Sequence, residues 1–393
     1  MPTSFRKNLT CLYLIKIAKW FMLFMPIVVP FYQSNGLEMR DVFTLQAIYS
    51  VAIVVLEIPS GYLADVLGRR KTLIIGTILG TLGFGVYSFS YGFWGFLLAE
   101  MVLGFGQSLI SGADSAMLYD TLMASGKKEH YIKFEGRMVS VGNFAETIAG
   151  ILGGLLAEYA LRAPYVGQTF IAFIGVPAAF LLVEPTRHKQ LVKAKFSDIL
   201  KIVRYSLFEH KELKWNIYFS SIIGASTLTM AWFVQPYFAV VDIPLALYGV
   251  LWAGLNLLVG LSAIYAHRVE QYVGQIKTMF FILLFLPIGY VALSQIHAVA
   301  GLGILVIFYI VRGIATPVLK DYINRLADSN VRATVLSVRN FVIRVLFACI
   351  GPFVGWYTDT FSLHQALLLS GIVFFVLASF TFAMQLAVLR RKK

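Results

Sequence analysis

Charge and cysteine are both scarce in this sequence, and each shortage excludes a class of protein. Only 13% of the 393 residues are charged, whereas soluble domains carry roughly 25%. The two cysteines, Cys11 and Cys349, lie in apolar stretches, which excludes a disulfide framework and favours free, packed thiols. A chain that is 59% hydrophobic, with a mean hydropathy of +0.76, would aggregate in water. These values indicate a polytopic membrane protein.

The patterns that mark enzymes and metal proteins are missing as well. The sequence has no nucleophile grouped with a base and an orienting residue, and no phosphate-binding loop, so neither hydrolysis nor ATP-driven work is indicated. His267 and His297 lie near the ends of apolar runs without the spacing of metal ligands. We therefore expect no catalytic residue, no cofactor and no metal site.

Long apolar runs are what the sequence has instead. The first run follows Arg6 and Lys7 and has no small-residue cleavage site, so we interpret it as a spanning helix rather than a signal peptide. The expected fold class is an all-α membrane protein with twelve transmembrane helices, each needing roughly 20 apolar residues. We predict them at about 9–33, 41–64, 72–91, 93–121, 131–161, 165–183, 214–240, 244–267, 277–296, 299–326, 331–358 and 362–388.

The positive charges indicate the topology. Most of the 33 lysine and arginine residues fall in loops on the side that holds the N-terminus, and Arg40 and Arg162 are the two on the opposite side. The positive-inside rule places both termini in the cytoplasm of an inner, or plasma, membrane, which requires an even number of spans. The net charge of +13 would suit nucleic acid, but its clustering in short loops excludes that partner. We expect a monomer whose partner is the lipid bilayer.

Two halves of the sequence repeat each other. Short groups of residues recur in the same order, at an offset that drifts slowly from 206 to 197 positions. Because the repeat contains six helices, both halves insert the same way up. We expect a first six-helix bundle at 1–183, a linker at 184–213 and a second bundle at 214–393. The matching groups include Gly68 with Gly274, Pro30-Phe31-Tyr32 with Pro236-Tyr237-Phe238, Asp120 with Asp321, and Asn143-Phe144 with Asn340-Phe341.

The linker has the pattern of an amphipathic helix. Ser197 is a suitable N-cap, and apolar residues at 199, 200, 203 and 207 share one face, with Lys201 and Arg204 on the other. This pattern predicts a helix that lies in the cytoplasmic interface and connects the two halves. A solvated linker remains the alternative.

A polar, glycine-flanked, basic turn at 61–72 separates the second and third apolar runs. Three adjacent cations have no partners in hydrocarbon, so the turn must lie on a membrane face. It resembles the loop between the second and third helices of the major facilitator superfamily, and the repeat extends the resemblance over nearly the whole chain. The matching residues are Gly61, Asp65, Gly68, Arg69 and Lys71.

The resemblance implies that this turn is a conformational latch, formed by Gly61, Asp65, Gly68, Arg69, Arg70 and Lys71, which holds the halves together on the cytoplasmic side. Asp65 would lie near the start of the eleventh helix, at 330–334, whose free N–H groups attract an anion. In the second copy Gln271 stands where Asp65 would be, so we expect an asymmetric latch. The alternative is that the cations only orient the turn.

Nine ionisable residues lie inside the predicted spans, where charge is costly unless it faces a cavity or is paired. Glu57 and Asp114 lie near span ends, which favours structural roles. For each of the others, a structural ion pair competes with a functional role. The predicted substrate-binding candidates are Lys16, Lys19, Arg312 and Arg344, with Trp20, Tyr218 and Trp232 as rings that either stack on a substrate or pack; Glu146 and Glu100 are the proton-coupling candidates, and Arg339 is the remaining cation.

The resemblance implies a secondary active transporter in which two halves rock about a central site. The prominent cations favour a small organic anion or zwitterion as the substrate, with a proton as the coupling ion. Two alternatives remain: a multidrug efflux pump, and a non-transporting receptor on the same fold. Two departures weaken direct transfer of the family's schemes. Glu100 stands where many proton-coupled members carry arginine, and Gly351-Pro352 lies in the eleventh helix rather than the fifth.

Overall fold

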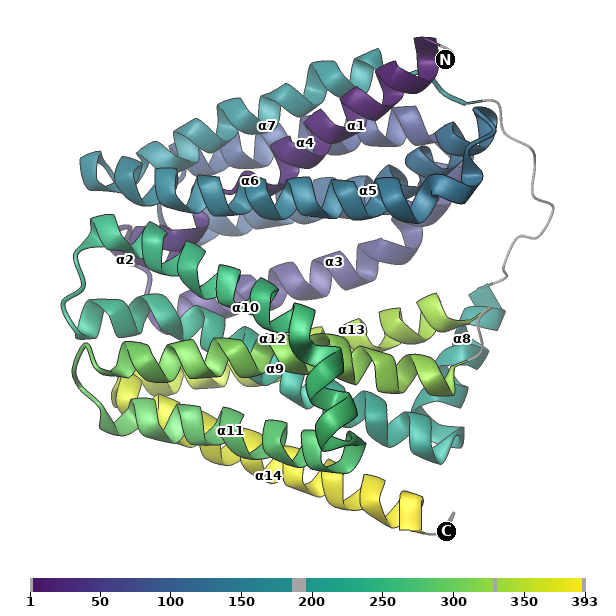
Figure 1. The fold of residues 1–393 in the computed structure, drawn as a ribbon. Helices are drawn as coiled ribbons and strands as arrows, with labels where there is room; N and C mark the ends of the chain where they lie inside the picture. The colour runs from purple at the N-terminus through teal and green to yellow at the C-terminus, as the bar shows by residue number, and fades with distance from the viewer. Residues whose placement is uncertain (1–2, 186–195, 328–330, 391–393) are drawn as a thin grey trace. The chain divides into compact units, whose positions relative to one another are not determined.

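The computed structural model describes residues 3–185, 196–327 and 331–390, in which every regular element is a helix (Figure 1). Side chains at 3–4, 57–62, 65, 112, 128, 132, 196–199 and 333 also lie outside the description. Within the described residues, twelve segments are long and apolar enough to cross a membrane. The predicted fold class is therefore confirmed.

The chain forms two compact units. The described residues of the first fall within Met1–Leu37, Ile48–Lys189 and Pro244–Ala253, and those of the second within Glu38–Ala47, Gln190–Ile243 and Gly254–Lys393. Compared with the predicted halves, residues 38–47 belong to the second unit and residues 244–253 to the first. The division into halves at 1–183 and 214–393 therefore remains a prediction.

The first half of the chain supplies most of the first unit. Its helices are α1 (Thr3–Trp20), η1 (Met25–Ile27), α2 (Val28–Ser34), α3 (Met39–Leu67), α4 (Arg69–Phe89), α5 (Gly92–Ala124), η2 (Lys128–His130), α6 (Tyr131–Tyr159) and α7 (Ala163–Leu181). Small residues allow close contact, since a Cβ at Gly83 would collide with Leu103 and one at Gly154 with the backbone of Gly249. At the end of the unit that holds the Gly68 turn, the core contains Leu12, Ile15 and Leu118.

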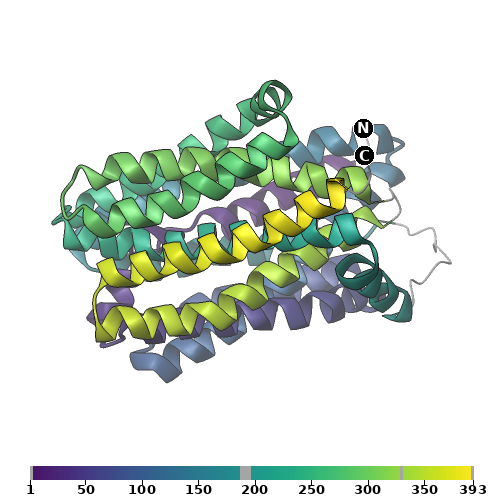
Figure 2. The same cartoon turned by 90° about the horizontal axis from the view of Figure 1, so that it is seen from below.

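The second half of the chain supplies most of the second unit. Its helices are α8 (Phe196–Arg204), a π-helical turn η3 (Tyr205–Glu209), α9 (Lys211–Val240), α10 (Leu245–Val273), α11 (Gln275–Gln295), α12 (Gly301–Leu326), α13 (Arg332–Thr360) and α14 (Leu363–Arg390). α14, yellow in Figures 1 and 2, packs beside α11. Inside this unit the Asp359 carboxylate of α13 accepts hydrogen bonds from the backbone N–H groups of Met39 and Arg40, at 2.9 and 2.7 Å, and so caps the start of α3.

The predicted amphipathic helix packs onto the second unit. Val203 and Leu207 contact a buried cluster that includes Ile217 and Ile323. Leu200 is exposed, however, and the side chains of Ser197 and Ile199 lie outside the described residues. One part of the apolar face is therefore used for packing, while Leu200 stays accessible.

Two glycine turns occupy matching positions of the repeat. Gly68 has φ +100° and is the N-cap of α4, and Gly274 has φ +85° and is the N-cap of α11. Residues with a side chain rarely adopt these angles. Below, the glycine-turn end of a unit means the end that holds Gly68 or Gly274.

The first predicted span is not one continuous helix. α1 ends at Trp20, and helical structure resumes at Met25. The residues in between are apolar, but Pro26 follows them and cannot donate a hydrogen bond to the Met22 carbonyl, so it interrupts a continuous helix at this point. The predicted span at 9–33 overlooked this signal. Both cysteines are free, but the prediction that they are packed holds only for Cys11, which is buried. Cys349 is exposed, because its side of α13 has no helix packed over it in the described residues.

Candidate functional site

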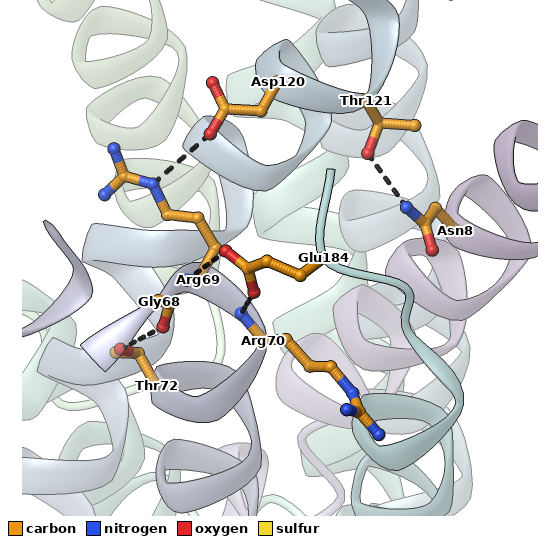
Figure 3. Close-up of polar contacts among 8 residues, drawn as sticks. All are labelled: Asn8, Gly68, Arg69, Arg70, Thr72, Asp120, Thr121 and Glu184. Atoms are coloured by element: carbon orange, nitrogen blue, oxygen red, sulfur yellow. Dashed lines mark hydrogen bonds and ion pairs between the residues drawn. The ribbon is translucent and has the colours of Figure 1, made fainter. Parts of the chain in front are cut away.

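The predicted latch turn is anchored by a carboxylate (Figure 3). The Glu184 Oε1 and Oε2 atoms accept hydrogen bonds from the backbone N–H groups of Arg69 and Arg70, at 2.9 and 2.7 Å. These are the free N–H groups at the start of α4, where the helix dipole favours an anion. Sequence reasoning missed this role, although Glu184 directly follows the end of a predicted span.

The side chains of the turn make further contacts within the first unit. The Arg69 Nε atom lies 3.6 Å from Asp120 Oδ2, and Arg70 Nη2 donates to the Phe180 carbonyl at 2.8 Å. The Thr72 hydroxyl donates back to the Gly68 carbonyl, also at 2.8 Å. Lys71 is exposed. The arginines therefore connect the start of α4 to α5 and α7.

Parts of the predicted latch lie outside the described residues. The side chain of Asp65, the Cβ environment of Gly61 and residues 328–330 lie outside the described part of the chain. A contact between Asp65 and the start of α13 therefore remains a prediction.

The second copy of the turn has an ion network of its own. Arg325 Nη2 lies 2.6 Å from Asp321 Oδ2, and Arg325 Nη1 lies 3.4 Å from Glu270 Oε1. Glu270 precedes Gln271, the residue that aligns with Asp65, by one position. An acid is therefore present near the second turn even though the aligned position has lost it.

Glu184→Gln should destabilise the first unit modestly. The variant retains an acceptor oxygen but loses the charge and one of the two equivalent acceptors, and losing a helix N-cap interaction costs about 1 kcal/mol. We expect the melting temperature of the detergent-purified protein to fall by about 2–4 °C. Glu158→Gln, at an exposed position of α6, is the control and should leave it unchanged. Equal melting temperatures for both variants would contradict this role of Glu184.

Lys16 is paired within the first unit. Its Nζ atom lies 3.6 Å from Asp114 Oδ2, with both side chains largely buried, and 5.8 Å from the centre of the Trp20 ring. Asp114 also accepts a hydrogen bond from the Ser115 N–H, at 2.7 Å. This arrangement gives Lys16 the structural counter-ion that competed with a substrate role.

Lys19, Arg312 and Arg344 are half-buried on α1, α12 and α13. No carboxylate among the described residues lies within ion-pair distance of any of them. The Arg312 guanidinium lies over the Tyr309 ring, 5.3 Å from its centre. Lys19 is in the last turn of α1, where the helix dipole favours a cation. Asp114 is the acid whose negative charge acts on Lys19. Their role in binding an anion stays a prediction.

The break after α1 brings polar backbone into the span. The Leu23 N–H donates to the Gln168 Oε1 of α7 at 3.0 Å, and Gly153 of α6 approaches so closely that an added Cβ would overlap the Leu23 carbonyl oxygen. Non-helical backbone within a membrane is stable only when it is buried in protein or lines a cavity. In many transporters such broken helices form the binding site. The candidate Lys19 lies immediately before the break.

Glu100 is part of a buried hydrogen-bonded group in the first unit. The Tyr32 hydroxyl donates to Glu100 Oε1 at 2.9 Å, and the Tyr32 and Tyr87 hydroxyls lie 2.6 Å apart. Glu100 is only 5% exposed. The ring of Tyr165 stacks on that of Tyr87, 5.1 Å between centres. Sequence reasoning selected Glu100 but missed both tyrosines, although Tyr32 lies in a repeated group.

The remaining candidates are placed separately. Glu146 is half-buried on α6, and Trp232 is half-buried on α9. The Tyr218 hydroxyl lies 3.4 Å from the Leu207 carbonyl of the π-helical turn. Tyr218 therefore belongs to the packing between α9 and this turn.

Within the described residues, twelve segments are long and apolar enough to span a membrane, several of them contain charged residues, and the first is broken, so together they define a multi-pass membrane protein. The sequence model of the Major Facilitator Superfamily matches residues 9–352, so the chain belongs to this family of membrane transporters.

Similar proteins within the family differ in what they carry. The chain is 19% identical to the quinolone resistance protein NorA of Staphylococcus aureus over 208 residues, which is 53% of this chain and 50% of NorA. It is 23% identical to a D-xylose transporter of Levilactobacillus brevis over 308 residues, 77% of this chain and 60% of that protein. The chain thus spans about half the length of curated relatives such as NorA.

Solved structures support the same fold. The structure of the nucleoside transporter NupG aligns with a TM-score of 0.80 at 15% identity, covering 97% of this chain and 99% of that one. At this identity the likeness shows the fold alone.

Proposed function

We propose that the protein is a secondary active transporter that moves a small organic anion or zwitterion across the inner, or plasma, membrane by alternating access. The observation that carries this proposal is the set of three cations without carboxylate partners, Lys19, Arg312 and Arg344. Uncompensated charge inside a span is costly and marks substrate pathways. The broken helix beside Lys19 adds polar backbone to the same region of the first unit.

The proposal includes a topology and a coupling ion. Both termini lie in the cytoplasm, where the concentration of cations in the loops is expected. A proton drives transport through Glu100 or Glu146, because a carboxyl group in a dry setting gains and loses a proton near neutral pH more readily than an exposed one. The protein works as a monomer.

Export of a drug-like compound is the second candidate, favoured by the similarity to NorA. It requires that acids rather than lysines and arginines make the substrate contacts. A non-transporting receptor on the same fold would bind a ligand without moving it.

The test begins with a thermal-shift screen of the purified protein against anions, zwitterions, neutral sugars and organic cations. A stabilising anion or zwitterion is then tried in counterflow with proteoliposomes. We expect Lys19→Gln or Arg312→Gln to weaken its affinity about tenfold or more, because a hydrogen bond to a charged group is worth about 1.5–3 kcal/mol. Arg268→Gln, exposed on α10, is the control and should bind normally.

Each other outcome selects another function. Unchanged affinity in both Lys19→Gln and Arg312→Gln would remove the argument for an anion. Stabilisation by organic cations alone would support efflux of drug-like compounds. Binding without counterflow would support a receptor.

A further inference from the structure

We propose that Arg339 and Lys320 form an oxyanion-binding site inside the second unit, which takes a phosphate group. This site is separate from Arg312 and Arg344, and the proposal does not depend on the transport activity. Arg339 lies on α13 and Lys320 on α12.

Arg339 is held in place by neutral groups. It is only 5% exposed. Its Nε atom donates to the Ser220 hydroxyl of α9 at 2.5 Å, and its Nη1 donates to the Asn340 side-chain oxygen at 3.2 Å. The Ser221 hydroxyl donates to the Arg339 carbonyl at 3.2 Å, which fixes the backbone as well. These contacts orient the guanidinium but do not neutralise its charge.

The missing component is a negative charge. No carboxylate in the described residues lies within ion-pair distance of Arg339 or Lys320. Lys320 is half-buried on α12, which packs against α13, and it lies at a similar distance from the glycine-turn end as Arg339 does. Two neighbouring cations that lack a counter-ion destabilise a largely dry site, and a bound anion would relieve this repulsion.

The donor set fits an oxyanion. A guanidinium presents N–H groups in a planar fork that matches phosphate or carboxylate oxygens, and an ammonium adds a compact charge. The Ser220 hydroxyl lies beside the guanidinium. A phosphate group carries enough charge and oxygens to use both cations at once.

The depth of the site leaves two sources for that phosphate. Arg339 is seven residues from the start of α13, and Lys320 six residues from the end of α12, so each lies about 10 Å from the glycine-turn end of the unit. A helix of 29 residues such as α13 exceeds the hydrocarbon thickness of about 30 Å. The site therefore lies near the boundary between headgroups and hydrocarbon, within reach of a dissolved phosphate or a lipid headgroup.

The fold itself does not require these cations. At the repeat offsets of the neighbouring matched groups, the first unit has Gly142 in place of Arg339 and Tyr119 in place of Lys320. Gly142 simply packs against the Trp20 ring. The second unit thus has charges at positions where the same bundle is built without them.

The test measures thermal unfolding of the full-length protein at constant ionic strength. In a neutral detergent, inorganic phosphate is titrated against chloride; in a parallel series, the protein is placed in nanodiscs with or without phosphatidylglycerol. We expect the wild type to be stabilised by several degrees in one series and Lys320→Gln to lose most of that shift, with at least tenfold weaker binding. Arg268→Gln should keep the wild-type response.

A shift with free phosphate identifies a dissolved oxyanion, whereas a shift with phosphatidylglycerol alone identifies a lipid headgroup. Arg339→Gln is expected to behave as Lys320→Gln; if it fails to fold, the half-buried Lys320 decides the question. No shift in either series, or an equal shift in the wild type and Lys320→Gln, would overturn the proposal.

Discussion

Gly153→Ala is expected to lower the melting temperature by about 6 °C or more and to abolish transport. The added Cβ would overlap the carbonyl oxygen of Leu23, in the break between α1 and η1. Backbone cannot give way as a side chain does, and overpacking of this kind costs about 3 kcal/mol or more. α6 cannot simply move aside, because Gly150 and Gly154 on the same helix closely contact Gly249.

Gly136→Ala is the matched control for this substitution. Gly136 is also on α6, but a Cβ there meets nothing within 4 Å. Alanine is favoured over glycine in a helix by about 1 kcal/mol, so this variant should be as stable as the wild type or slightly more stable. If Gly153→Ala unfolded at the same temperature as Gly136→Ala, the close approach of α6 to the break would be wrong.

Glu100→Gln is expected to reduce proton-driven accumulation of substrate at least tenfold while leaving counterflow largely intact. The amide still accepts the hydrogen bond from Tyr32, but it cannot bind and release a proton. Counterflow exchanges substrate for substrate and needs no net proton movement, so it separates coupling from binding. The groups near Glu100 include Tyr32 from α2, which bonds it directly, Tyr87 from α4, which bonds Tyr32, and Tyr165 from α7, which stacks on Tyr87.

Tyr32→Phe and Glu146→Gln complete this experiment. Tyr32→Phe removes one hydrogen bond to the carboxylate, so accumulation should persist with an altered dependence on pH. If Glu100→Gln accumulates substrate as the wild type does and Glu146→Gln does not, then Glu146 is the coupling residue. A parallel loss of counterflow and melting temperature in Glu100→Gln would instead indicate a structural role.

Those parts of the fold that depend on local chemistry could be predicted from the sequence. Twelve apolar runs predict twelve spans because hydrocarbon requires them. The turns at Gly68 and Gly274 follow from the need for a positive φ between two helices. The break after Trp20 has a local signal in Pro26, which cannot donate to the Met22 carbonyl. Its partners could not be predicted, because Gly153 and Gln168 lie far along the chain.

For the candidate residues, too, the sequence predicted what is local and not the contacts between distant parts of the chain. Charge inside a span identified Lys16, Glu100 and Asp114, but not their partners. The pairing of Lys16 with Asp114 depends on how α1 packs beside α5, and the bond from Tyr32 to Glu100 depends on how α2 packs there. Glu184 was overlooked because its target is a pair of backbone N–H groups, which are present in every helix and have no sequence signal.

The state of the two thiols has a practical consequence for mapping which side of the membrane each loop faces. Cys11 is buried, and Cys349 is exposed only within a spanning segment, away from the loops on either face. Neither should react readily with a membrane-impermeant maleimide. The natural chain is therefore a nearly silent background into which reporter cysteines can be introduced one at a time, without first removing its own.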